Sequence, residues 1–504
     1  MAPAKVCFNC AQDGLQKCCP TATGCSRNRR VKKKNVRIAR AFAQTSEEDS
    51  DHDKLTTPID MSIERIFPAD SSREVDQVTA FFLDRDVFQE KGYSKTPISV
   101  AVPDHCQTWL TRGFNRQVER KNDVFWAGYA QSWQTAFPII SKARFDERFA
   151  DSSRHTPDFI ALMLAMQLGT DRKDTHEGVY GLYQNVKQWC QSLEAHGMIS
   201  LLLLQTYMLI ALYEVSHAIH PAAYLTIGHL VRLAELLQLQ QCNNPHRLNG
   251  ASRHWLSVEE ERRAWWGIYI LDRYTSICGF RTVKPVLDEP ATDMSLPMDD
   301  ENFHLGDKSE SHSIFRAHDR PVSPFARTCQ AAILLSKVIK NTKKDKPYIS
   351  ETAYLRMDIS QLRTFCAHES LILPRDPKQF SALLPAIAIL FSAELALNYS
   401  QATKHTGNDV SVCCPSPLRL ETRNFAEALQ RHYNNPHTRT AFGPFIPNAL
   451  YQMAKCQAFD VLTLGEVYHD NNAEVLRYTL RLSGENWREG DMYLKMLQNG
   501  NQDA

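Results

Sequence analysis

The stretch SVEEERRAWWGIYILDRYTSICGF, residues 257–280, decides which fold the chain adopts. Ser257 followed by three glutamates predicts the start of a helix, because a side-chain oxygen caps free backbone N–H groups and acids favour the positive end of the helix dipole. Apolar residues then run almost all the way round the helix, so we expect it to be buried on most sides.

The residues that follow cannot continue this helix. RTVKPVLDEPATDMSLPMDDE, residues 281–301, contains Pro285, Pro290 and Pro297. Proline lacks a backbone N–H and clashes with the preceding helical turn, so a continuous helix is excluded. We therefore expect this stretch to lie extended over the helical core.

The rest of the body also shows helical patterns. The apolar residues of 230–237 recur at helical spacing, and 380–400 is another apolar helical stretch. Few segments alternate apolar and polar residues, so the predicted fold class is all-α. The apolar stretch 198–215 approaches the length of a membrane span. We interpret it as a buried helix, because it contains polar residues and ends at a glutamate.

Length and charge divide the chain into segments. Its 504 residues are enough for two or three folded units. Residues 1–44 carry ten Lys or Arg against one acid, and residues 45–57 carry five acids against one Lys, although the formal net charge of the chain is only +1. We predict a basic arm (1–44), an acidic linker (45–57), a helical body (58–340) and a C-terminal helical region (341–504), divided at the polar break 340–347.

The arm is rich in cysteine. Five of the 14 cysteines lie in the first 25 residues, and no apolar secretory signal is visible. A reducing compartment and a metal site are therefore expected rather than disulfides. Zinc prefers four deprotonated ligands in a tetrahedron. Cys7 and Cys10 form a C-x-x-C pair, Cys18 is a third ligand, and Cys19 and Cys25 are alternative fourth ligands.

A basic run, RNRRVKKK, follows these cysteines. Its charges fit DNA phosphates, which would give a salt-sensitive affinity without sequence preference, or a nuclear import receptor. A solvated run without a role is the alternative. The charged residues are Arg27, Arg29, Arg30, Lys32, Lys33 and Lys34.

The central helix carries residues that we interpret as structural. Trp265 and Trp266 are expected to fill the core, since large aromatic side chains dominate core burial. Asp272 and Arg273 lie in an apolar helix and should each be paired, because a lone buried charge is costly. Arg281 is a candidate partner for Asp272. The functional alternative is that these residues hold a hinge between the helix and the extended stretch, through which the domain senses a signal.

The sequence shows none of the constellations that catalysis needs, so we predict that the chain is not an enzyme. Asp299, Asp300 and Glu301 could suggest a magnesium site, but we interpret them as a solvated acidic turn after a proline. His217 and His220 lie three apart without an evident third metal ligand. The sequence has no P-loop, dinucleotide fingerprint or nucleophile elbow.

Three stretches of the body resemble the fungus-specific regulatory domain, or middle homology region, of fungal zinc-cluster transcription factors. They are YAQSWQTAFPIISKARF (129–145), ISLLLLQTYMLIALYEVSHAIHPAAYLTIGHLVRLAELLQLQ (199–240) and EEERRAWWGIYILDRYTSICGFRTVKPVLDEPATDMSLP (259–297). The third is the most specific, with its acidic-basic start, Trp pair, Leu-Asp-Arg, Gly-Arg-Pro-like turn and final Leu-Pro. It departs from the family where Phe280 separates Gly279 from Arg281. The likeness spans residues 120–340 and implies a large helical regulatory domain.

The arm is similar to the second half of the family's DNA-binding module, which holds two zinc ions with six cysteines. By this resemblance Cys7, Cys10 and Cys18 are the fourth, fifth and sixth ligands, and a first half with the DNA-reading basic helix is expected before them. We attribute its absence to a shortened N-terminus or a misplaced gene start, with evolutionary loss as the alternative. Cys7 and Cys10 fit less well as the first pair, because the spacer AQDGLQK is not a basic run. The resemblance implies one zinc ion or none rather than two, and doubtful sequence-specific DNA readout by this chain alone.

Together these patterns predict a large helical regulatory domain behind a short cysteine-rich, basic, mostly irregular N-terminal arm. The predicted function is a nuclear regulator of RNA polymerase II transcription with incomplete DNA binding. One alternative is an interaction protein or coregulator that acts through a partner transcription factor, and a more distant one is an all-helical enzyme. The expected partners are DNA and either a second copy of the chain or a partner transcription factor, with no membrane.

Overall fold

Every regular element in the described part of the chain is a helix. The computed structural model describes residues 124–499. Residues within this span that are not described are 152–153, 171–175, 242–253, 279–283, 292–293, 315–321, 345–347, 373–376, 403–412, 435–442, 465–470 and 486. The described residues contain no strand and form one isolated β-bridge, between Ser295 and Ser313. The all-α fold class is confirmed.

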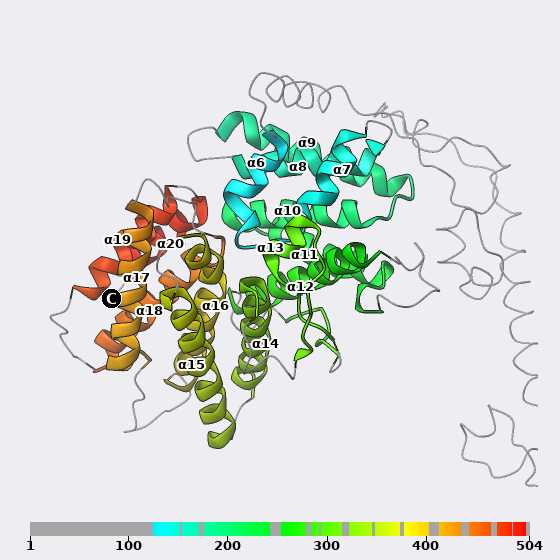
Figure 1. Cartoon of the computed structure of the whole chain (residues 1–504). Helices are drawn as coiled ribbons and strands as arrows, with labels where there is room; N and C mark the ends of the chain where they lie inside the picture. Colours follow the sequence, from blue (N-terminus) through cyan, green and yellow to red (C-terminus); the bar gives the residue numbers. More distant parts are fainter. Residues whose placement is uncertain are drawn as a thin grey trace, which may run out of the picture. The chain divides into compact units, whose positions relative to one another are not determined.

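The described helices belong to one compact unit with a continuous hydrophobic core. Figure 1 shows their arrangement. The first helices are α6 (Val124–Tyr129), η2 (Ala130–Gln134), α7 (Lys142–Ala150), α8 (Pro157–Gln167), η4 (Leu168–Thr170), α9 (His176–Ala195), α10 (Leu201–Ser216), α11 (Ala222–Leu236), η6 (Leu239–Gln241) and α12 (Trp255–Cys278). They are followed by α13 (Asp300–Leu305), α14 (Pro324–Thr342), α15 (Ile349–Ile372), α16 (Pro377–Ala402), α17 (Ser416–Asn434), α18 (Ile446–Leu464), α19 (Asn472–Gly484) and α20 (Arg488–Asn499).

Helix α12 lies between two groups of helices (Figure 1). It packs against α10 and α11 on one side and against α14 on the other. Helices α14 and α16 form the most extensive helix pair in the described part, and α16 packs further against α15 and α18. Most side chains of α12 from Ala264 to Ile277 are buried. The buried central helix expected from residues 257–280 is confirmed.

The start of α12 differs from the prediction. The helix begins at Trp255, and the backbone N–H groups of Ser257 and Val258 donate to the carbonyl of His254 at 3.0 and 3.2 Å. The Ser257 hydroxyl accepts instead from Arg144 Nη1 at 2.6 Å. The capping role predicted for Ser257 is therefore wrong, because a distant arginine binds the hydroxyl that was expected to cap the helix.

Two non-helical segments, 284–291 and 294–299, follow α12, and we call them the strap. Neither contains a helical turn, as the prolines predict. Leu287, Leu296 and Met298 of the strap are buried. The strap is therefore anchored on the helical core, as expected for the described part of 281–301.

The apolar stretch 198–215 corresponds to α10. Its N-terminus is capped, because the backbone N–H of Leu203 donates to Ser200 Oγ at 3.1 Å. Every side chain from Leu203 to Ser216 is buried, so the interpretation as a buried helix is confirmed. Among the described helices, residues 379–402 are long and apolar enough to cross a membrane, but 83% of their most apolar window is buried inside the protein.

The division predicted at residues 340 and 341 falls within α14. Helix α14 packs against α16 and α15, which both lie beyond that point. Helices from the predicted body and the predicted C-terminal region thus contribute to one core. The arm (1–44) and the acidic linker (45–57) lie outside the described residues, so their boundaries stay predictions.

Candidate functional site

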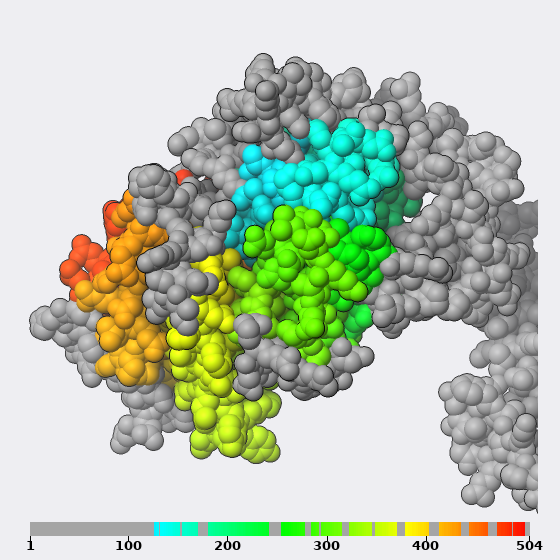
Figure 2. All heavy atoms as spheres, in the orientation of Figure 1, coloured from blue at the N-terminus to red at the C-terminus, as the bar shows by residue number. Residues whose placement is uncertain are grey.

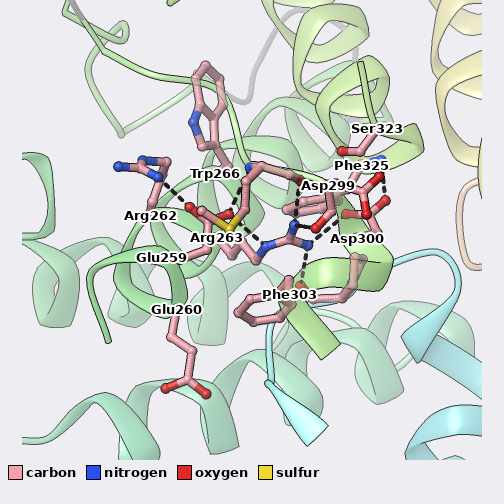
Figure 3. A network of polar contacts seen from close by, with 12 residues as sticks. Glu259, Glu260, Arg262, Arg263, Trp266, Asp299, Asp300, Phe303, Ser323 and Phe325 are labelled. Carbon is pink, nitrogen blue, oxygen red and sulfur yellow. Dashed lines mark hydrogen bonds and ion pairs between the residues drawn. The ribbon is translucent and has the colours of Figure 1, made fainter. Parts of the chain in front are cut away.

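Arg263, in the first half of α12, is the centre of a buried polar network (Figure 3). Its side chain is fully buried. Nε donates to Glu259 at 2.9 Å and Nη1 donates to Asp300 at 2.8 Å. The other bonds go to the backbone oxygens of Pro138 (3.1 Å), Met298 (2.8 Å) and Asp299 (3.4 Å). Since a guanidinium has five N–H donors, every donor of Arg263 is used.

This network joins α12 to four other segments of the chain. Arg263 binds the loop before α7, the end of the strap and the start of α13. Glu259 also accepts from the backbone N–H of Met298 at 2.9 Å, and Asp300 accepts from that of Phe325, at the start of α14, at 3.1 Å. Burial by itself would lower the pKa of Arg263, but Asp300 and Glu259 raise it above its ordinary value. Arg263 therefore stays charged inside the core.

Of the three acidic residues after Pro297, Asp299 and Glu301 are exposed, as the solvated turn predicted from the sequence requires, whereas Asp300 is only partly exposed. Asp299 caps α13 by accepting from the backbone N–H of Asn302 at 3.0 Å, and Asp300 pairs with Arg263. That prediction is wrong for Asp300, because its partner lies 37 residues earlier in the chain. Glu301 is exposed. No group of three or more His, Cys, Asp or Glu in the described part could hold a metal ion.

Glu260 forms a separate link from α12 to α7. Its side chain is buried, and it accepts from the Ser141 backbone N–H at 3.1 Å and from Arg144 Nη1 at 2.7 Å. Burial raises the pKa of Glu260, and the charge of Arg144 opposes this effect. Glu259 and Glu260, two of the three glutamates expected to favour the helix dipole, thus form contacts with other segments of the chain.

A second network surrounds Arg273, near the end of α12. Nη1 donates to Asp272 at 2.5 Å and Nε donates to Ser336 of α14 at 3.0 Å. Nη2 donates to the carbonyl of Leu287 at 2.7 Å and to Glu289 at 3.3 Å. The pairing expected for Asp272 and Arg273 is present, and it extends to the strap and to α14.

Glu289 of the strap completes the second network. It accepts from Tyr269 at 2.7 Å, from Ser336 at 2.6 Å and from Lys340 at 2.7 Å. Partial burial would raise the pKa of Glu289, but these donors and Arg273 lower it to about 2. Glu289 is therefore a carboxylate at neutral pH, and it fastens the strap to both α12 and α14.

Asp272 of α12 binds the backbone of the strap. Its carboxylate accepts from the backbone N–H of Val286 at 3.0 and 3.1 Å and from that of Leu287 at 3.0 Å. Burial raises the pKa of Asp272, and these backbone donors oppose the rise. Arg281, the partner suggested from the sequence, lies outside the described residues.

The tryptophan pair belongs to the core. Trp265 and Trp266 are buried, with their rings edge to face at 5.0 Å between centroids. Trp266 Nε1 donates to the carbonyl of Ser295 in the strap at 3.0 Å. His217 is also buried, beside Tyr213, whereas His220 is exposed.

The remaining sites predicted from the sequence lie outside the described residues. These are the zinc ligand candidates Cys7, Cys10, Cys18, Cys19 and Cys25, and the basic run Arg27, Arg29, Arg30, Lys32, Lys33 and Lys34. Sequence reasoning also missed Arg263, Glu289 and Ser336. The available signal was the presence of Glu259 and Arg263 one turn apart, with apolar residues following them in the same helix.

Residues 123–377, about half of the chain, match the family described as the fungal specific transcription factor domain. The chain belongs to this family. The match contains both buried networks and extends beyond residue 340, where the resemblance seen in the sequence ended. The fungal transcription factor domain thus includes α6 to α15 of the described structure.

The similar proteins are named as transcription factors or transcriptional regulators. The chain is 35% identical over 187 residues to Transcription factor BOA15 of Botryotinia fuckeliana, which covers 36% of this chain and 98% of that protein. It is 32% identical over 101 residues to the Ascochitine biosynthesis cluster transcriptional regulator of Didymella fabae, covering 20% of this chain and 17% of that protein. It is 31% identical over 104 residues to the Citrinin biosynthesis transcriptional activator mrl3 of Monascus ruber, covering 20% of each.

Family membership assigns the class of function. The chain is a fungal transcription regulator and not an enzyme. It spans nearly all of BOA15 but only about a fifth of the other two relatives. No solved structure matches the chain.

Proposed function

We propose that this chain is a nuclear activator of RNA polymerase II transcription that serves one biosynthetic pathway. The observation that carries the proposal is the family match over 123–377, together with the names of the relatives. Those names include regulators of ascochitine, citrinin and depudecin biosynthesis.

The direct test is a deletion strain compared with the parent by RNA sequencing. We expect a small group of biosynthetic genes to lose expression in the deletion strain and to regain it when the chain is restored. Unchanged transcription of every biosynthetic gene would contradict the proposal. Restoring the chain with Arg263→Ala is a useful second arm, because a disrupted framework should fail to restore expression.

The arm is the segment that we assign to nucleic acid and to import. We propose that it binds one zinc ion or none, through Cys7, Cys10 and Cys18 with either Cys19 or Cys25. The basic run 27–34 then contacts DNA phosphates or a nuclear import receptor. Elemental analysis of the purified chain tests the zinc part, since two tightly held zinc ions per chain would contradict it.

The alternative role is a coregulator that reaches DNA through a partner transcription factor. A gel shift with added zinc at two salt concentrations separates the two roles. Retention of one DNA sequence over a scrambled one at the higher salt supports direct binding. Retention that is lost with salt and is equal for both sequences supports the coregulator, because phosphate contacts alone carry no sequence information.

A further inference from the structure

Helix α20, the last helix of the described part, is held to the domain by few buried residues. It packs against α18 and α19 and, less extensively, against α10. Between residues 488 and 498 only Glu489 and Gly490 are buried, and Tyr493 and Leu497 pack against the core with part of their surface exposed. A helix with so little buried surface opens at a lower free energy than the core does.

The position of α20 allows it to move by itself. The C-terminal helices α19 and α20, in red, lie at the left edge of the described part in Figure 2. Because no described element follows α20 in the chain, the helix can leave the core while the chain before it stays folded.

Glu489, in the first turn of α20, is a buried carboxyl group at this contact. It is 4% exposed, and in the part of the chain that the structure describes its Oε2 has no hydrogen-bond partner. Tyr274 of α12 has a single hydroxyl proton, which the carbonyl of Pro444 at 3.1 Å and Glu489 Oε1 at 3.3 Å share. One shared proton does not compensate a carboxylate for the loss of water, since a buried charge needs several donors or a counter-charge.

No cation of the described part pairs with Glu489. The titratable and charged groups on the elements that pack here are His217 of α10, Tyr274 of α12, Tyr451 of α18, Glu485 of α19, and Arg488, Asp491 and Tyr493 of α20 itself. Of these groups, only the hydroxyls of Tyr274 and Tyr493 favour the ionised form of Glu489, and burial outweighs them, so its pKa is raised to about 8. Arg488 is exposed and forms no ion pair with Glu489.

The docked position of α20 covers aromatic side chains of its neighbours. Trp487, just before α20, is buried, and its ring meets His217 of α10 edge to face with centroids 5.8 Å apart. Tyr493 stacks on Tyr451 of α18 at 4.6 Å and accepts from Asn448 at 2.9 Å. Release of α20 therefore uncovers apolar surface that the docked helix hides.

We propose that α20 is a pH-sensitive switch, docked on the core while Glu489 carries a proton and released when Glu489 ionises. The neutral acid fits the site, because it can donate its proton to a tyrosine oxygen and leaves no charge in the core. A carboxylate does not fit, because it is buried there without a counter-charge. The domain thereby changes the surface that it offers to other proteins as the pH rises. The proposal concerns the folded domain and does not depend on which genes the chain regulates.

The pH range of the switch follows from the two states of Glu489. In the released helix the side chain is in water and ionises at its ordinary pKa of 4.5, whereas in the docked helix its pKa is about 8. The proton's contribution to docking is therefore complete below pH 4.5, and the ratio of docked to released molecules falls about tenfold per pH unit up to pH 8. Above pH 8 both states are ionised, and the ratio stays constant.

Hydrogen exchange measured by mass spectrometry on the full chain tests the proposal, with rates corrected for intrinsic exchange at each pH. Between pH 6 and pH 8 we expect the protection of the α20 amides to fall about tenfold per pH unit, while the α14 amides stay better protected. In Glu489→Gln the neutral amide should keep α20 docked, so the protection should not change with pH. Glu474→Gln on α19 is the matched control, since it removes an exposed carboxylate and should leave the wild-type response intact.

Three outcomes overturn the proposal. Protection of α20 that does not change with pH in the wild type shows that Glu489 does not control docking. An equal pH dependence in Glu489→Gln assigns the effect to another group. Equal protection of α20 and α14 at every pH shows that α20 opens only together with the whole domain. Circular dichroism at pH 6 checks that Glu489→Gln is folded, and the first and third outcomes need the wild type alone.

Discussion

At the scale of single residues, the buried charges of α12 are the feature that sequence reasoning undervalued. Arg263 is inside the core, yet every N–H donor of its guanidinium has an acceptor. Removing one member of such a network is costly, because the remaining charges stay buried without compensation. The same logic applies to Arg273, whose partners come from the helix, the strap and α14.

Arg263→Ala should therefore destabilise the domain severely. We expect a loss of about 3–5 kcal/mol in the free energy of unfolding, because Glu259 and Asp300 lose their buried counter-charge. Arg232→Ala is the matched control, since Arg232 forms an exposed ion pair with Glu235 within one helix and such pairs contribute at most about 1 kcal/mol. Urea unfolding of both variants measures the difference. Equal losses would show that the network does not stabilise the fold.

The raised pKa of Glu489, at the start of α20, predicts that the stability of the domain depends on pH. Its side chain is buried, it accepts from Tyr274 at 3.3 Å, and burial raises its pKa to about 8. The folded state therefore binds a proton that the unfolded state releases above its ordinary pKa of 4.5. This proton contributes to the free energy of unfolding. Its contribution is fully present below the pKa of Glu489 in the unfolded state and is lost as the pH rises towards 8, the pKa in the folded state.

Glu489→Gln should remove this dependence. Between pH 6 and pH 8 we expect the wild type to lose about 2 kcal/mol relative to the variant, at 1.36 kcal/mol per pKa unit. Thermal or urea unfolding at a series of pH values gives the two slopes. Glu474→Gln on the exposed face of α19 should leave the wild-type slope intact. Parallel curves for wild type and Glu489→Gln would contradict the raised pKa.

At the scale of secondary-structure elements, the position of α12 depends on a close approach to its neighbours. A Cβ added at Gly267 would lie 2.4 Å from Met208 Cε of α10 and 2.9 Å from the ring of Phe137. Glycine at this position thus leaves the space that the Met208 methyl group and the Phe137 ring occupy against α12. Gly228 of α11 is different, because an added Cβ there would meet nothing within 4 Å.

Gly267→Ala and Gly228→Ala should act in opposite directions. Alanine is the better helix former by about 1 kcal/mol, so we expect Gly228→Ala to stabilise the domain by up to that amount. At Gly267 the steric conflict outweighs that gain, and we expect a net loss of about 1–3 kcal/mol. Chemical unfolding of the two variants side by side measures both effects. A stabilising Gly267→Ala would mean that α12 does not pack this closely.

At the scale of the whole molecule, the hydrophobic core extends beyond the residue at which the family match ends. The match ends at residue 377, at the start of α16, although α16 is the main partner of α14. A chain cut after residue 377 would expose the apolar face of α14 that α16 covers. We expect such a fragment to aggregate or to lack a cooperative thermal transition, whereas the full chain should unfold cooperatively. A sharp transition in the fragment would show that α16 is dispensable.

The sequence by itself determined the fold class, the central helix and the strap, since these follow from local properties. The all-round apolar pattern of 257–280 indicates a buried helix, and Pro285, Pro290 and Pro297 exclude a helix after it, whatever else surrounds them. The sequence also indicated that Asp272 and Arg273 must be paired, because a charge in an apolar helix needs a partner.

Only the tertiary structure decided which residues serve as partners. Arg263 and Asp300 are 37 residues apart, and Arg273 and Ser336 are 63 residues apart. No local sequence pattern predicts either contact, because the partners lie so far apart in the chain. Ser257 was expected to cap a helix and instead binds Arg144, for the same reason. A charged or hydroxyl group binds whichever group the packing of the helices brings near, and that packing depends on the whole core at once.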